Sequence, residues 1–190
     1  MKKLMFAFAT VLAFAATISL TSCNEDPCKN VVCGTHGTCN AGTCDCAAGY
    51  EKDTNGRCDL ITSSLYLADY SAAEFDQISG KPVQVGGKDL KYDSSIKAVT
   101  GSITKVTIAN LGDYLCTKNG VDTKSAVEAT VKGDSLSINF TDCNNTWVGK
   151  GYFNRSAKTV TINYSNTYPP DPKTPSKLVT DKNKTVLTKK

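Results

Sequence analysis

The sequence has almost no histidine: His36 is the only one among its 190 residues. Nucleophilic catalysis usually needs a histidine or an activated lysine beside the nucleophile, and His36 lies within a dense cluster of cysteines. The sequence also lacks a phosphate-binding loop, a dinucleotide fingerprint and a metal-binding motif. We therefore expect a protein that is not an enzyme and carries no cofactor. A hydrolase that uses paired carboxylates, which leave no sequence signature, is the alternative.

The sequence also has little excess of positive charge. It holds 22 basic and 18 acidic residues, which give a formal charge of +4. Domains that bind nucleic acid gather their lysines and arginines into a strongly basic patch. We therefore expect no nucleic-acid partner.

The first 22 residues read as a secretion signal. Lys2 and Lys3 form a charged start, residues 4–20 form an apolar run, and Thr21 and Ser22 end it with small side chains. A retained membrane helix is the alternative. The run is short for a hydrocarbon core of about 30 Å, however, and no basic cluster follows it.

The end of the leader, LTSC at 20–23, resembles the lipobox of bacterial lipoproteins. The resemblance implies that Cys23 is acylated and becomes the first residue of the mature chain. Residues 23–27 are then a lipidated tether. Two or more acyl chains anchor a protein stably, whereas one holds weakly. The expected partner is therefore a membrane, reached through the lipid.

The residues after the anchor, Asn24, Glu25 and Asp26, resemble a short acidic signal of some Gram-negative lipoproteins. It implies an outer-membrane protein exposed at the cell surface. A solvated acidic tether without sorting information is the alternative.

The chain has nine cysteines, an odd number that disulfides alone cannot use. With Cys23 lipidated, eight remain, and an even number in an exported chain indicates four disulfides. Six of the eight lie between residues 28 and 58, and the other two are Cys116 and Cys143. The cysteines thus divide the chain into two parts, and spacing alone leaves the pairing within the first part open.

The first part resembles an EGF-like domain over residues 28–59. The resemblance is carried by CDCAAGY at 44–50, followed by Cys58, and includes the Gly-aromatic pair Gly49-Tyr50. A chain below about 40 residues needs such cross-links because it buries too little surface. The resemblance implies three disulfides: Cys28 with Cys39, Cys33 with Cys44, and Cys46 with Cys58.

No metal is expected in this module. The cysteines lack the paired C-x2-C spacing of zinc sites. Some EGF-like domains bind calcium through acidic residues before the first cysteine, where Glu25 and Asp26 lie, but Pro27 interrupts that pattern. Calcium binding stays an open alternative.

The second part, residues 60–168, reads as all-β. Residues 135–140 and 159–164 alternate strictly between apolar and polar side chains, and residues 127–131 repeat the pattern. A turn at 132–135 predicts an antiparallel hairpin, which brings Cys116 and Cys143 to the same end and allows them to pair. Further strands are expected at 64–70, 96–111 (one long strand or two short ones) and 147–153, and a helical turn at 72–76.

The meander of short strands loosely resembles lipocalin-like barrel domains that follow lipoprotein leaders, and a two-sheet sandwich is the alternative. Candidates for lining a ligand cavity are Trp147, Tyr152, Phe153 and Tyr164, for which core packing is the other interpretation. The prolines after Tyr168 indicate the end of the domain. Residues 169–190 are therefore predicted to be a Pro/Lys-rich tail.

The sequence thus predicts a lipid-anchored envelope protein that presents a β-domain to bind a protein, a glycan or a small apolar ligand. The alternative is a structural component of an envelope assembly with no ligand of its own.

Overall fold

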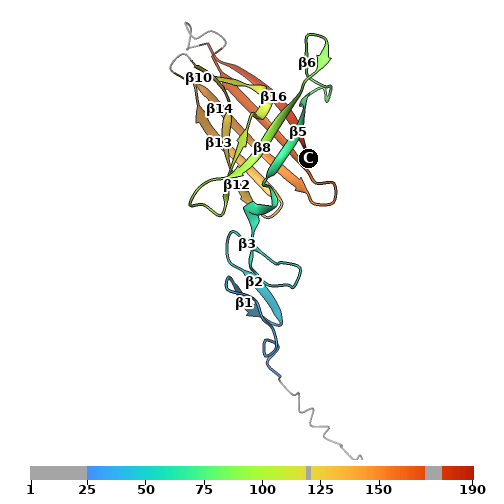
Figure 1. Ribbon diagram of the computed structural model, residues 1–190, viewed down its shortest axis with the longest axis vertical. Helices are drawn as coiled ribbons and strands as arrows, with labels where there is room; N and C mark the ends of the chain where they lie inside the picture. The colour runs from blue at the N-terminus through green and yellow to red at the C-terminus, as the bar shows by residue number, and fades with distance from the viewer. Residues whose placement is uncertain (1–24, 119–120, 170–176) are drawn as a thin grey trace, which may run out of the picture.

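The computed structural model describes residues 25–118, 121–169 and 177–190. It contains a small disulfide-rich module and, beyond it, a closed antiparallel β-barrel (Figure 1). The predicted leader and its Cys23 lie outside the described residues. Within the described ranges, no helix has the length and apolar character needed to cross a bilayer.

The module consists of two short hairpins held by disulfides. Strands β1 (Gly37–Asn40) and β2 (Thr43–Cys46) pair antiparallel, as do β3 (Tyr50–Glu51) and β4 (Leu60–Ile61). The core of the module is almost entirely sulfur, which is why the cross-links are needed. Its disulfides have the pairing that the EGF-like pattern implies: Cys28–Cys39, Cys33–Cys44 and Cys46–Cys58.

The second part is a closed eight-stranded barrel, so the barrel prediction is confirmed and the sandwich alternative is wrong. The strands follow the order β12-β13-β14-β15-β16-β5-β8-β9, and β9 pairs with β12 to close the ring. Closure leaves no exposed sheet edge. The strands are β5 (Ala68–Asp76), β8 (Lys91–Ala98), β9 (Lys105–Ala109), β12 (Ala126–Lys132), β13 (Ser135–Asp142), β14 (Asn145–Asn154), β15 (Thr159–Tyr168) and β16 (Val179–Lys189).

The two ends of the barrel differ. The proximal end faces the module, and the distal end, on the far side, carries two small hairpins (Figure 1). These hairpins join β6 (Gln84–Val85) to β7 (Lys88–Asp89) and β10 (Leu115–Lys118) to β11 (Val121–Lys124). A one-turn 3-10 helix stands at each end: η1 (Thr62–Leu65) is proximal and η2 (Leu111–Asp113) distal.

The fourth disulfide lies at the distal end. Cys116 on β10 is joined to Cys143, in the turn that follows β13, and their Cα atoms are 5.5 Å apart. The sequence predicts this bridge, because the residues before β12 and after β13 meet at one end of the antiparallel hairpin. It ties the β10–β11 hairpin to the barrel wall.

The module is docked against the proximal end. Thr62, in η1, donates its backbone N–H to the carbonyl of Gly49 in the module (2.9 Å). Arg155 of the barrel forms an ion pair with Glu51 of the module. These contacts join the two parts through backbone and charge.

Two predictions at the start of the barrel are wrong. Residues 64–70 begin as the helix η1 and only then enter β5, and residues 72–76, expected as a helical turn, are the rest of β5. Along β5 the side chains of Tyr70, Ala72 and Glu74 are buried while Ser71 is exposed, which is the period of a strand. Pairing with strands on both sides outweighs the helix propensity of the alanines.

The predicted Pro/Lys-rich tail is also wrong in its second half. Residues 179–189 form β16, the longest strand, which pairs with β15 on one side and β5 on the other. Because the barrel continues with β16, the domain does not end at Tyr168; residues 170–176, which include three of the prolines, lie outside the described residues. The expected strand region 96–111 resolves into β8 and β9, with Gly101 at φ +78° in the turn between them.

Candidate functional site

The barrel interior is divided into an apolar and a polar half. Near the module, inward side chains such as Ile96, Leu136 and Leu187 form a dry core. Toward the distal end the inward positions carry hydroxyl, amide and carboxyl groups. These residues are Glu74, Tyr92, Tyr114, Tyr164, Asn166, Tyr168, Asp181, Asn183 and Thr185.

Glu74 is at the centre of the polar half and only 2% exposed. Its carboxyl accepts hydrogen bonds from the hydroxyls of Thr185 (2.6 Å), Tyr164 (2.7 Å) and Tyr92 (2.8 Å). Burial raises the pKa of Glu74 above its ordinary value, and the three hydroxyl donors oppose that rise. The three hydrogen bonds hold the Glu74 carboxyl in one position inside the barrel.

Two glycines make room for this network. Gly149 on β14 lies opposite Tyr164, and a Cβ at this position would come within 2.6 Å of the Tyr164 Cβ. Gly112, at φ +72°, donates its N–H to the hydroxyl of Tyr92 (2.7 Å), and a Cβ there would collide with the Tyr164 hydroxyl. The positions of the Tyr92 and Tyr164 side chains therefore require glycine at residues 112 and 149.

A second cluster lies closer to the distal opening, around Asp181. Its carboxylate accepts hydrogen bonds from the hydroxyls of Tyr168 (2.8 Å) and Tyr114 (3.2 Å), and the Asn183 amide donates to the Tyr114 hydroxyl (3.2 Å). Burial, and after it the Asp181 charge, raises the pKa of Tyr114, while its contact with the Asn166 side chain opposes the rise. Tyr114 stays neutral, so its hydroxyl acts as both donor and acceptor.

A cavity of about 370 Å³ opens beside this cluster, between β5, β16 and η2. Its wall includes the carboxyls of Glu74, Asp76 and Asp181, together with Asn183 and Tyr114. Lys182 is exposed at its edge and Val83 and Leu90 add apolar surface. A concave surface with a few convergent polar groups is typical of a site for a small ligand.

Two buried polar atoms on the paired strands β14 and β15 have no hydrogen-bond partner among the described residues: the indole nitrogen Nε1 of Trp147 and the amide oxygen Oδ1 of Asn166. Trp147 is 1% exposed and Asn166 is 0% exposed. The amide nitrogen of Asn166, in contrast, donates to Asn145 (3.2 Å). Leaving a buried donor or acceptor unsatisfied costs about 1–3 kcal/mol. A buried polar atom without a partner in the protein is therefore expected to form its hydrogen bond with a water or with a bound molecule.

The structure places the four aromatic ligand candidates in three different surroundings. Trp147 and Tyr164 point into the polar half, and Phe153 points into the apolar half, with its ring centroid 5.3 Å from that of Tyr66. Tyr152 faces the outside of the barrel and is 57% exposed, because it alternates with the inward Phe153 along β14. None of the four lines the cavity itself; Tyr164 is linked to it through its hydrogen bond to Glu74.

Three residues of the site were not predicted from the sequence: Glu74, Asn166 and Asp181. Glu74 fell in the segment expected to be helical, and Asp181 fell in the expected tail. Asn166 continues the alternation of β15 on the same face as Ile162 and Tyr164, so extending that strand pattern by two residues could have found it. No signal in the sequence marked the other two.

No family model matches this chain, and searches among curated proteins and solved structures found no similar protein. The site is therefore interpreted from its own residues.

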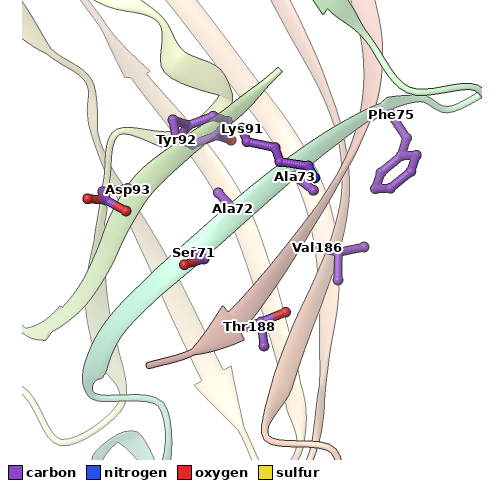
Figure 2. Close-up of a pocket in the computed structure, with 9 residues that line it drawn as sticks. All are labelled: Ser71, Ala72, Ala73, Phe75, Lys91, Tyr92, Asp93, Val186 and Thr188. Atoms are coloured by element: carbon purple, nitrogen blue, oxygen red, sulfur yellow. The ribbon is translucent and has the colours of Figure 1, made fainter. Parts of the chain in front are cut away.

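A second hollow lies on the outer wall of the barrel. Figure 2 shows it across β5, β8 and β16, with Phe75, Val186 and Lys91 among the side chains around it. Its volume is about 640 Å³, and the ammonium of Lys184 lies 4.7 Å from the centroid of the Phe75 ring. The hollow lacks buried polar groups that converge on one point, so it is the weaker candidate for a ligand site.

Among the described residues, one group of ligand-type side chains converges as at a metal site: Cys116, Asp142 and Cys143. The two cysteines are joined in a disulfide, so neither offers the thiolate that a metal needs. In the module, the Asp26 carboxylate accepts a hydrogen bond from the N–H of Cys28 (2.9 Å). That contact engages one of the two acidic residues considered for calcium.

Proposed function

We propose that this protein is a lipid-anchored component of a bacterial envelope whose barrel binds a small polar ligand at its distal end. The leader and Cys23 support the anchor, and the odd cysteine number supports it independently. The observation that carries the binding function is the polar half of the barrel. This half contains a cavity bounded by Glu74, Asp181 and Asn183, and it also holds two buried polar atoms that lack partners.

The fold suits such a role because it holds the site rigidly. The apolar half of the interior fixes the strands, and the disulfide between Cys116 and Cys143 ties the distal hairpin to the wall. A preformed site loses less conformational entropy when a ligand binds. The distal end of the barrel, with its two small hairpins, lies on the side away from the module (Figure 1), which suits a site presented outward by the module.

Binding is tested on the purified protein with arrays of glycans, lipids, peptides and small metabolites. We expect saturable binding to at least one class, weakened at least tenfold in the Asp181→Asn variant. Tyr152→Ala, on the outer wall, is the control and should bind as the unaltered protein does. Binding that is equally strong in the Asp181→Asn variant, or absent across all arrays, contradicts the proposal.

The anchor is tested by mass spectrometry of the protein from its native membrane. We expect a mature chain that begins at an acylated Cys23. The Cys23→Ser variant, which has no thiol to carry the lipid, should lack the acyl groups. Protease treatment of intact cells then reports whether the barrel is exposed at the surface. Detection of an unacylated Cys23 contradicts the anchor without affecting the binding site.

A structural role in an envelope assembly is the second candidate function, favoured by the ion-paired junction between module and barrel at Glu51, Arg155 and Asp134. Co-purification of envelope proteins together with no ligand on any array would favour it. Hydrolytic activity against surface glycans or proteins would support the remaining alternative, that the protein is a hydrolase.

A further inference from the structure

We propose that the distal site takes a polyhydroxylated ligand, a carbohydrate, and that one of its hydroxyls occupies the position near Trp147, Asn166 and Asp181 that the Tyr114 side chain now covers. This inference rests on the proposed function and adds the chemical class of the ligand. It also assigns Tyr114 as a side chain that the ligand displaces.

The geometry begins with three adjacent strands. Trp147 on β14 is the register partner of Asn166 on β15, and Asn166 is the register partner of Asp181 on β16. Register partners point to the same face of a sheet, so the three side chains form a row across the inside of the wall. The row offers, in order, an N–H donor, an amide oxygen and a carboxylate.

The unpartnered atoms of this row define the chemistry of a complementary group. Trp147 Nε1 can only donate a hydrogen bond and Asn166 Oδ1 can only accept one. A hydroxyl does both at once, because it has one O–H and two lone pairs. An ammonium group has no lone pair for Trp147, a carboxylate has no proton for Asn166, and an acyl chain satisfies neither.

Tyr114 already shows that the neighbouring positions suit a hydroxyl. Its own hydroxyl donates to Asp181 and accepts from the Asn183 amide, both at 3.2 Å. These distances are at the long end for hydrogen bonds, so the contacts are weak. A hydroxyl of a ligand can make the same pair of bonds. Tyr114 therefore stands in for part of the ligand.

Displacement requires movement of one side chain. Tyr114 and Asp181 line the cavity, and Tyr114 also contacts the Asn166 side chain, so Tyr114 lies between the cavity and Asn166. The backbone on either side is held, because Leu111 is fully buried and Cys116 is joined to Cys143. We therefore expect the Tyr114 ring to swing aside while the chain around it stays in place.

The protein carries its own reporter, because Trp147 is its only tryptophan. Tryptophan emission is measured on the purified full-length mature protein during titration with D-glucose, D-galactose, N-acetylglucosamine and maltose. Further titrations use 1,4-diaminobutane as a cationic probe and decanoate as an apolar one. A neutral glycan array widens the set of sugars. The same measurements are made on Tyr114→Ala, on Tyr114→Phe and on the outer-wall control Tyr152→Ala.

We expect at least one sugar to change the emission saturably in the unaltered protein and in Tyr152→Ala. In Tyr114→Ala the Kd for that sugar should fall about tenfold, since the displaced side chain no longer competes. In Tyr114→Phe, which keeps the ring and removes the hydroxyl, the fall should be smaller. If Tyr114→Ala does not fold, the Tyr114→Phe result and the response of the unaltered protein decide.

Two results overturn the inference and differ in what they imply. If decanoate or the diamine saturates the emission change and no sugar does, the ligand class is wrong while the distal binding site stands. If no probe and no array glycan binds the unaltered protein or either Tyr114 variant, a buried water is the only partner of Trp147 and Asn166. In that case the carbohydrate site does not exist.

Discussion

Arg155 on the barrel and Glu51 in the disulfide-rich module form an ion pair, with 2.5 Å between Nη2 and Oε2. The same guanidinium reaches Asp134 through Nε at 2.6 Å. Arg155 therefore joins the turn after β12 to the last hairpin of the module. We therefore expect Arg155 to fix the orientation of the module while contributing little to the stability of either part.

Replacing Arg155 by Met is expected to loosen the junction with little loss of stability. The arginine is 45% exposed, so the pairs contribute no more than about 1 kcal/mol. NMR relaxation should show the module and the barrel tumbling together before the change and more independently after it. Lys105→Met, which breaks an exposed pair with Glu128 within the barrel, is the matched control. Unchanged joint tumbling in Arg155→Met would show that the backbone hydrogen bond between Thr62 and Gly49 and the packing around it suffice.

Replacing Glu74 by Gln is expected to change how stability depends on pH. Because burial raises the pKa of Glu74 above 4.5, the folded state holds the proton more tightly than the unfolded state does. The contribution of Glu74 is therefore fully present below about pH 4.5 and is lost as pH rises through its folded pKa. Urea unfolding between pH 2 and pH 8 should show the stability of the unaltered protein falling relative to Glu74→Gln as pH rises above about 4.5.

Asp76 gives a control of opposite sign. Hydrogen bonds from Ser79 lower the pKa of Asp76 below 3.8. Its contribution is present above that pH and is lost as pH falls, so the unaltered protein should lose stability relative to Asp76→Asn only in acid. The same trend in both variants would show that a global charge effect, and not the individual carboxyls, sets the pH dependence.

Gly149→Ala is expected to destabilise the barrel by about 1–3 kcal/mol, because the new Cβ lies 2.6 Å from both the Asn163 carbonyl oxygen and the Tyr164 Cβ. Gly151, two residues along the same strand, is the matched control: there the nearest atom is 3.0 Å away. Thermal unfolding should rank Gly149→Ala well below Gly151→Ala. Equal transition temperatures would mean that Tyr164 can shift freely, and the network around Glu74 would then not be rigid.

Removing the distal disulfide with Cys116→Ser and Cys143→Ser together is expected to cost up to about 3–4 kcal/mol, since the bridge closes a loop across 27 positions. Hydrogen exchange should accelerate in β10 and β11 and much less in β14 and β15. A urea midpoint equal to that of the unaltered protein would show that the hairpin is held by its other contacts.

Much of the fold follows from the sequence. The disulfide pattern of the module is implied by the resemblance of residues 28–59 to an EGF-like domain, and strict alternation identifies β13 and the first part of β15. These strands were predictable because their inward residues, such as Leu136 and Ile162, lie in the apolar half of the barrel. In that half the inward positions of these two strands carry apolar side chains, so each strand shows a regular alternation in the sequence.

The strands β5 and β16, which were predicted in part as a helical turn and as a tail, carry much of the polar site. Glu74 on β5 and Asp181, Asn183 and Thr185 on β16 occupy inward positions. Polar side chains on the inner face remove the alternation on which strand prediction depends. The polar residues of the site thus made β5 and β16 unrecognisable as strands in the sequence. The two strands are identified by the pairing of β16 with both β15 and β5 in the structure.

The most direct test of the account is the location of the bound ligand. Amide NMR spectra of the protein are recorded with and without the tightest ligand from the arrays. We expect shift changes to concentrate at the distal residues around Glu74, Asn166 and Asp181. Changes confined to the outer wall around Phe75 and Val186, or to the module, would contradict a binding site inside the barrel.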